Sequence, residues 1–336
     1  MRRAFLAAAL AAACTALPAA AKDAKTRTPE VQAEALVFNP DKPSQTRVGR
    51  LTWLGGLRLW SKHWLFGGFS ALEISPDGAS LISASDRATW WSAALVLNDG
   101  IPVGIGESAF HDMPDAHGQA LEHGEADSEG LATGADGSVY VSFERDHRIV
   151  RFVPPDPANP NTWHQSRPEP LPSPPELTQA PNNAGLEAIA FLKDGTLFAL
   201  TESLPAEPGY NRGWLIRGGK WEPFAYRRTE PFDPTDAALL PNGDLLVLER
   251  RFSMLGGLGA RLCAISAADL TPGAKLECRT VAEMAPPQSI DNMEGLAVRR
   301  NEKGETIVYI ISDDNFSRIQ RTVLLVFRLE PETPGP

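Results

Sequence analysis

Basic side chains are in the minority in this chain of 336 residues. Its 32 lysines and arginines stand against 42 aspartates and glutamates, which gives a formal net charge of −10. A nucleic-acid-binding surface needs a basic face to neutralise phosphates, so this balance argues against nucleic acid as a partner. An acidic balance is compatible with cation binding and equally with plain solubility.

Motifs of several enzyme classes are also missing. No Gly-x-Ser-x-Gly nucleophile elbow is present, because Gly68-Phe-Ser70-Ala-Leu lacks the second glycine. No His-Glu-x-x-His motif is present either. His111, His117 and His123 lie among acids between residues 109 and 126 and could bind a transition metal. Their spacing matches no standard zinc motif, so we interpret this stretch as a solvated polar loop.

Beyond residue 21 the chain has no apolar run long enough to cross a membrane. At its start, two arginines, an apolar run and three alanines predict a signal peptide over residues 1–21. The paired arginines also fit a twin-arginine signal, so Sec and twin-arginine export both stay open. We therefore expect a periplasmic or secreted protein, with a flexible leader over residues 22–44 and a single domain over residues 45–336.

Cysteine is scarce, with three residues, of which Cys14 lies in the expected signal peptide. Cys263 and Cys278 lie in two predicted strands joined by a loop centred on Pro272. Antiparallel pairing of these strands would bring the two cysteines together, and an exported protein meets oxidising conditions. We predict a disulfide between them; two buried thiols are the alternative.

One repeated unit is abundant. In its clearest copy a short apolar run opens with Glu129, reverses at Asp136-Gly137 and returns as an alternating strand that ends at Glu144, which predicts a β-hairpin with a carboxylate at each open end. The unit recurs at intervals of about 50 to 60 residues, room for about four strands. The opening acids of the five copies are Glu73, Glu129, Glu187, Asp236 and Glu294. The closing acids are Asp86, Glu144, Glu202, Glu249 and Asp313.

This period predicts an all-β fold, a β-propeller with five visible repeats and therefore five blades, or six if one repeat is hidden. The last repeat has only one clear strand after Asn315. We expect the strand that begins at Arg47 to complete the C-terminal blade and so close the ring.

Hairpin geometry places the opening and closing acids at one mouth of the central channel. Many carboxylates at close range need cations, raised pKa values or arginines. We assign four opening acids as ligands of a hard cation, with calcium as the best fit: Glu129, Glu187, Asp236 and Glu294. We assign proton relay to four closing acids: Glu144, Glu202, Glu249 and Asp313. The following arginines, Arg87, Arg145 and Arg250, either pair with these acids or bind an anionic substrate. Alternatively, the acids bond backbone amides and join adjacent blades.

An ordered set of motifs carries a family resemblance. Glu129-Gly-Leu-Ala, Asn292-Met-Glu-Gly-Leu-Ala and Ser312-Asp-Asp-Asn-Phe, among others between Val48 and Leu329, resemble the phytase-like, "esterase-like activity of phytase" family of exported bacterial proteins. The resemblance implies a propeller and a hydrolase of phosphate or carboxylic esters. In such an enzyme, we expect a bound metal to polarise the ester or phosphoryl oxygen and a neighbouring carboxylate to act as general base on the attacking water. A periplasmic propeller that binds a ligand or partner without chemistry is the rival interpretation. Arginines and lysines for substrate phosphates are few, which disfavours inositol hexakisphosphate.

Overall fold

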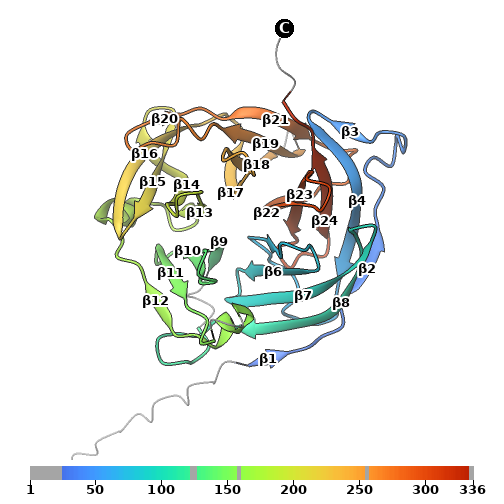
Figure 1. The fold of residues 1–336 in the computed structure, drawn as a ribbon, viewed down its shortest axis with the longest axis horizontal. Coiled ribbons are helices and arrows are strands. Elements are labelled where there is room, and N and C mark those ends of the chain that lie inside the picture. Colours follow the sequence, from blue (N-terminus) through green and yellow to red (C-terminus); the bar gives the residue numbers. More distant parts are fainter. Residues whose placement is uncertain (1–24, 122–126, 157–159, 254–256, 333–336) are drawn as a thin grey trace, which may run out of the picture.

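In the computed structural model, five sheets are arranged in a ring (Figure 1). The structure describes residues 25–121, 127–156, 160–253 and 257–332. This arrangement confirms the prediction of an all-β propeller and gives it five blades. The expected signal peptide lies outside the described residues.

The blades follow one another along the chain. The first contains β5 (Glu73–Ile74), β6 (Ser80–Ser85), β7 (Thr89–Asn98), β8 (Ile101–Asp112) and β1 (Thr26–Arg27). The second contains β9 (Ser128–Thr133), β10 (Val139–Phe143), β11 (Arg148–Phe152) and β12 (Pro168–Pro170). The third contains β13 (Leu186–Phe191), β14 (Leu197–Glu207), β15 (Tyr210–Arg217), β16 (Lys220–Arg227) and β20 (Lys275–Leu276).

The fourth blade contains β17 (Asp233–Leu239), β18 (Leu245–Ser253), β19 (Gly257–Ile265) and β21 (Arg279–Met284). The fifth contains β22 (Asn292–Arg300), β23 (Thr306–Asp313), β24 (Thr322–Leu329), β4 (Leu51–Trp60) and β2 (Gln32–Ala35), with β3 (Arg47–Val48) beside β4. Of two short 3-10 helices, Pro160–Gln165 lies between β11 and β12 of the second blade, and Pro175–Gln179 lies between the second and third blades.

The hydrophobic core is divided among the five interfaces between neighbouring blades. Strand β24 shows why its sequence is a continuous apolar run. Val323, Leu325 and Phe327 join the cluster shared with the fourth blade. Leu324 and Val326 point the other way and join the cluster shared with the first blade. Because successive side chains of a strand alternate between faces, a blade covered on both sides needs apolar residues at every position.

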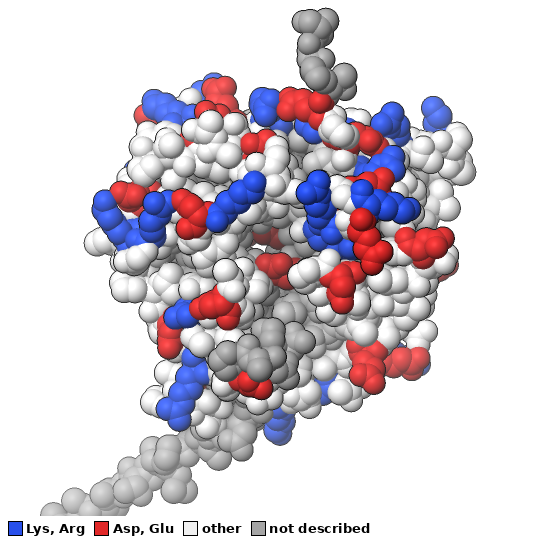
Figure 2. All heavy atoms as spheres, viewed as in Figure 1, with Lys and Arg blue, Asp and Glu red and all other residues white. Residues whose placement is uncertain are grey.

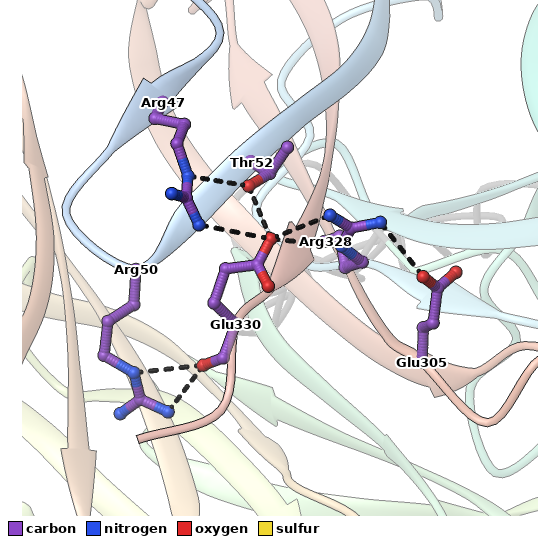
Figure 3. A network of polar contacts seen from close by, with 6 residues as sticks. All are labelled: Arg47, Arg50, Thr52, Glu305, Arg328 and Glu330. Atoms are coloured by element: carbon purple, nitrogen blue, oxygen red, sulfur yellow. Dashed lines mark hydrogen bonds and ion pairs between the residues drawn. The ribbon is translucent and has the colours of Figure 1, made fainter. Parts of the chain in front are cut away.

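The ring closes as predicted, because β4 from the N-terminal part pairs antiparallel with β24. A polar network secures this closure (Figure 3). The Glu330 carboxylate accepts hydrogen bonds from the Thr52 hydroxyl at 2.6 Å and from Arg328 at 3.0 and 3.1 Å. The Arg50 guanidinium donates to the Glu330 backbone oxygen at 2.8 and 3.1 Å. Segments 280 residues apart in sequence are thereby joined.

The segment expected to be a flexible leader, residues 22–44, supplies edge strands from residue 26 onwards. Strand β1 pairs with β8 and β2 pairs with β4. Arg27 also forms two hydrogen bonds with the Asp112 carboxylate, at 2.6 and 3.1 Å. Strands of the ring therefore begin ahead of residue 45.

Two further expectations concern the histidine stretch and the cysteines. His111 ends up buried in β8, with Nδ1 2.9 Å from the Thr26 hydroxyl, while residues 122–126, with His123, lie outside the described residues. Cys263 and Cys278 form the predicted disulfide, with their Cα atoms 5.3 Å apart. Such a bond is compatible with an extracellular protein. Among the described residues, no helix has the length and apolar character that a membrane span requires.

Candidate functional site

A cavity of 830 Å³ lies at one mouth of the channel. Two other cavities have similar volumes, 780 and 810 Å³, so size does not single this one out. Its lining does, because it gathers carboxylates from the second, third and fifth blades together with Asp86 of the first. These carboxylates belong to Asp86, Asp127, Glu129, Glu144, Glu187, Glu202, Asp291, Glu294 and Asp313. Seen down the ring, basic and acidic side chains are interspersed on the surface and acidic ones are visible in the central opening (Figure 2).

A β-bulge in the innermost strand brings the opening acids of three blades into the cavity. The pairing of β9 with β10 shifts register beside Glu129, that of β13 with β14 at Glu187, and that of β22 with β23 at Glu294. An extra residue on one strand bends it locally and re-aims a side chain. The three glutamates therefore occupy equivalent positions, and all three line the cavity.

In the fourth blade the same bulge falls on Thr235, one residue before the predicted ligand Asp236. The Asp236 carboxylate instead accepts hydrogen bonds from the backbone N–H groups of Leu296 at 2.6 Å and Ala237 at 2.8 Å. It is buried and joins the fourth blade to the fifth. Asp236 thus does not line the cavity, in keeping with the alternative that some acids hold blades together.

Glu73 in the first blade behaves in the same way. Its carboxylate accepts a hydrogen bond from the backbone N–H of Thr133 at 3.0 Å, which links the first blade to the second. The cavity is lined instead by Ser70, which precedes this strand by three positions.

Four of the five closing acids, Asp86, Glu144, Glu202 and Asp313, line the cavity, and Glu249 does not. The register explains the exception, since Asp233 pairs with Arg250 just as Asn292 pairs with Asp313. Arg250 therefore takes the position at the mouth. The Glu249 side chain turns into the blade, where it accepts a hydrogen bond from the Tyr226 hydroxyl at 2.7 Å and pairs with Arg261.

The three predicted arginines have different surroundings. Arg250 is ion-paired with Glu294 at 2.8 Å and with Glu202 at 3.3 Å inside the cavity. Arg145 lines the cavity and pairs with Asp127 at 2.9 Å. Arg87 is not part of the lining, because its guanidinium stacks 3.3 Å from the centroid of the Phe316 ring. The cavity thus offers two guanidinium groups, both already paired.

Burial raises the pKa of many of these acids. The pKa values of Glu294, Glu202 and Asp86 lie at about 7 for this reason. Burial, followed by the negative charge of Glu144, raises the pKa of Glu129 well above its usual value. Burial and then Glu129 do the same to Glu187, whose side chain is hydrogen-bonded to Glu144. Without cations, the cavity therefore holds protons near neutral pH.

Asp127, Glu129 and Glu144 form a group that could hold a metal ion. Each offers one oxygen, and the three oxygens lie within 4.8 Å of one another. Calcium–oxygen distances are about 2.3 to 2.6 Å, so one ion could contact all three. An all-oxygen set of this charge fits a hard cation. Glu129 was a predicted ligand and Glu144 a predicted proton relay.

Asp127 is the member that sequence reasoning missed. It stands two residues before Glu129, at the position that Asp233 and Asn292 hold before Thr235 and Glu294 in their blades. Aligning the repeats two residues before the bulge position, instead of at the opening acid alone, would have identified Asp127 as a candidate.

The chain was compared with protein families, curated proteins and solved structures. The family model described as "Phytase-like: Esterase-like activity of phytase" matches residues 65–316. No curated protein matches the chain. Among solved structures, a gluconolactonase of Xanthomonas campestris has 10% identity and a TM-score of 0.45, with 92% of this chain and 98% of that chain covered.

A second solved structure, a putative gluconolactonase, has 14% identity, a TM-score of 0.42 and coverage of 94% and 96%. The Malassezia sympodialis allergen Mala s 1 has 11% identity, a TM-score of 0.43 and coverage of 84% and 91%. At these identities and scores, the similarities carry no information on activity.

Proposed function

The chain belongs to the phytase-like family, and we propose that it is a metal-assisted hydrolase of phosphate or carboxylic esters that works at the acid-lined mouth. The observation that carries this proposal is the group formed by Asp127, Glu129 and Glu144, in a cavity that also holds Arg250 and acids whose pKa values are raised by burial. Cation ligands, proton donors and an anion-binding group in one cavity are the parts that hydrolysis of an ester needs.

Calcium is the cation that we propose for this group, since the donor set consists of carboxylate oxygens alone. A bound cation would polarise an ester or phosphoryl oxygen and lower the pKa of an attacking water. Arg145 offsets part of the negative charge through its pair with Asp127. The three carboxylates must lose their protons to bind the ion, so we expect its affinity to rise with pH.

Glu187, which the sequence assigned as a ligand, lies outside this group. Burial and the negative charge of Glu129 raise the pKa of Glu187 well above its usual value, and its hydrogen bond to Glu144 orients it. We assign it as the proton donor to the leaving oxygen. Glu202 and Asp313 line the same cavity and are placed to relay protons.

Arg250 is the group that we assign to an anionic part of the substrate. Glu294 and Glu202 hold its guanidinium in place from two sides. With only Arg145 as a second guanidinium in the lining, the cavity suits one phosphate or carboxylate rather than a polyphosphate.

A binding propeller without chemistry is the second candidate. It is favoured by the acids that bond backbone amides of a neighbouring blade. Besides Asp236 and Glu73, Glu144 accepts a hydrogen bond from the Gly185 N–H at 2.6 Å.

For localisation, the disulfide supports our proposal of a periplasmic or secreted protein with residues 1–21 as its signal peptide, exported by the Sec or the twin-arginine route.

The deciding experiment measures hydrolysis of p-nitrophenyl phosphate and p-nitrophenyl acetate with calcium and with EDTA. We expect turnover that needs calcium on both substrates. On phenyl phosphate and methyl butyrate, whose leaving oxygens need a proton, Glu187→Gln should lose on the order of 100-fold in kcat, as for removal of a general acid. Glu129→Gln should abolish the dependence on calcium. Glu302→Gln, at an exposed residue of the turn between β22 and β23, is the matched control and should behave as wild type. No turnover on either substrate, with folded protein that binds calcium, would support the binding propeller.

A further inference from the structure

We infer that the mouth carries an apolar subsite, which receives the hydrophobic group of an amphipathic ester. The inference rests on the proposed function and narrows its substrate class. Its basis is the position of the two most exposed large apolar side chains among the described residues, Ile319 and Phe252, which are 91% and 69% exposed.

Both side chains line the acidic cavity, together with the partly buried Leu258. Single exposed apolar residues are normal on protein surfaces. Here, however, the two largest exposures coincide at the edge of one charged cavity, and they come from different blades. Phe252 is in β18 of the fourth blade, and Ile319 is in the connection between β23 and β24 of the fifth. A polar cavity with an apolar border is the surface that an amphipathic ligand fits.

The connection that carries Ile319 is held in place. Phe316 has a φ of 49°, in the left-handed region that bulky residues seldom adopt. The Asp314 carboxylate accepts hydrogen bonds from the backbone N–H groups of Phe316 at 3.0 Å and Gly68 at 3.2 Å. Arg87 stacks on the Phe316 ring, which gives this arginine a positioning role. Ile319 is thus presented by a segment anchored to the first blade, so its exposure is a feature of an ordered connection.

The charge of the cavity limits what the polar end of the ligand can be. Its two guanidinium groups, those of Arg145 and Arg250, are already ion-paired, and the remaining charged groups of the lining are carboxylates. A ligand with many negative charges would be repelled. An ester with a single anionic or neutral polar head and an alkyl or aryl group meets both the head-binding groups and the apolar border.

A series of p-nitrophenyl esters tests this subsite: acetate, butyrate and hexanoate, assayed with calcium. Each kcat/KM is divided by the uncatalysed hydrolysis rate of the same ester. Each added methylene that buries about half of its surface against the apolar border should raise this relative kcat/KM about twofold. The value for hexanoate should therefore exceed that for acetate on the order of tenfold. The double variant Phe252→Ser, Ile319→Ser should bring this ratio close to one. Val103→Ser, at an exposed valine of β8 that does not line the cavity, should leave the ratio unchanged.

Failure of the subsite and failure of the proposed function give different results. Hydrolysis of all three esters at equal relative rates, or a preference that the double variant keeps, overturns the subsite and leaves the hydrolase in place. If no ester is hydrolysed, calorimetric binding of methylphosphonate and hexylphosphonate decides. Tighter binding of hexylphosphonate, on the order of tenfold and lost in the double variant, supports the subsite. Equal affinities, or no binding of either, overturn it.

Discussion

In the absence of divalent cations, the stability of the protein should fall as pH rises from about 5 to 7. This trend is the reverse of ordinary acid denaturation. The reason lies in the raised pKa values at the mouth. A carboxyl whose pKa is higher in the folded state holds a proton there that the unfolded chain has released. Its favourable contribution is complete below the unfolded pKa and is lost as pH rises through the folded pKa.

Glu294 sets the scale of the effect. Burial raises its pKa from 4.5 to about 7, against the opposing influence of Arg250, and its side chain is buried. Ionisation at neutral pH therefore costs about 3 kcal/mol relative to an unperturbed glutamate. For a protein of this size, that corresponds to a fall in melting temperature of about 4 to 5 °C. Glu202 and Asp86, with pKa values of about 7, act in the same direction.

A second set of carboxylates limits stability on the acid side. The Ser75 hydroxyl holds the pKa of Asp77 below its usual range, and Thr196 does the same for Asp194. These groups contribute stability above their unfolded pKa, and that contribution is lost as pH falls. In EDTA, the melting temperature should therefore have a maximum near pH 5.

Calcium should remove the decline on the neutral side. At a concentration of 100 times its dissociation constant it adds about 2.7 kcal/mol, but only where the ligands are ionised. Calorimetric melts at pH 4, 5, 6 and 7, in EDTA and in calcium, measure both effects. We expect a large calcium shift at pH 7, a small one at pH 5, and none at pH 7 for Glu129→Gln, while Glu302→Gln behaves as wild type. A melting temperature in EDTA that rises from pH 5 to 7, or an equal calcium shift at both values, would refute this reasoning.

Three further changes separate structural from functional groups. Asp236→Ala leaves two buried N–H groups without an acceptor and should destabilise the protein by about 2 to 6 kcal/mol in denaturant unfolding, with the calcium shift retained; loss of that shift would place Asp236 in the cation site. Arg250→Met should move the pKa of Glu294 further up, so that the decline of stability in EDTA extends to higher pH; a decline that ends at the same pH as in wild type would argue against this ion pair. Replacing Cys263 and Cys278 together by serine opens a 15-residue loop and should cost about 3 kcal/mol by urea unfolding, and an unchanged midpoint would contradict that estimate.

Much of the architecture could be read from local sequence. Asp-Gly and Asn-Gly turns between alternating runs specify hairpins, because few residues tolerate a positive φ at such turns; Gly78, Gly137 and Gly195 all have one. The recurrence of the hairpins gave the blades, and the incomplete last repeat gave the closing strand. These features depend on neighbours in sequence, and the structure confirms them.

The residues that form the site were harder to predict from the sequence. All five opening acids look alike in sequence, yet a bulge puts Thr235 where Glu294 stands in the next blade. A shift of one residue moves a side chain to the opposite face of a strand, so Asp236 and Glu249 turn into the protein while Arg250 reaches the mouth. The positions of the turns alone do not predict a one-residue shift of the strand register.

By itself, the sequence determined the repeat, the strands, the ring closure and the pairing of the two cysteines, since each follows from hydrophobic alternation, turn chemistry and order along the chain. Only the tertiary structure decided which carboxylates converge. It brought Asp127 to Glu129 and Glu144, set Arg250 between acids of other blades, and buried the whole group enough to raise its pKa values. The physical reason is that distance and burial between blades arise from the packing of the ring, which no single repeat contains.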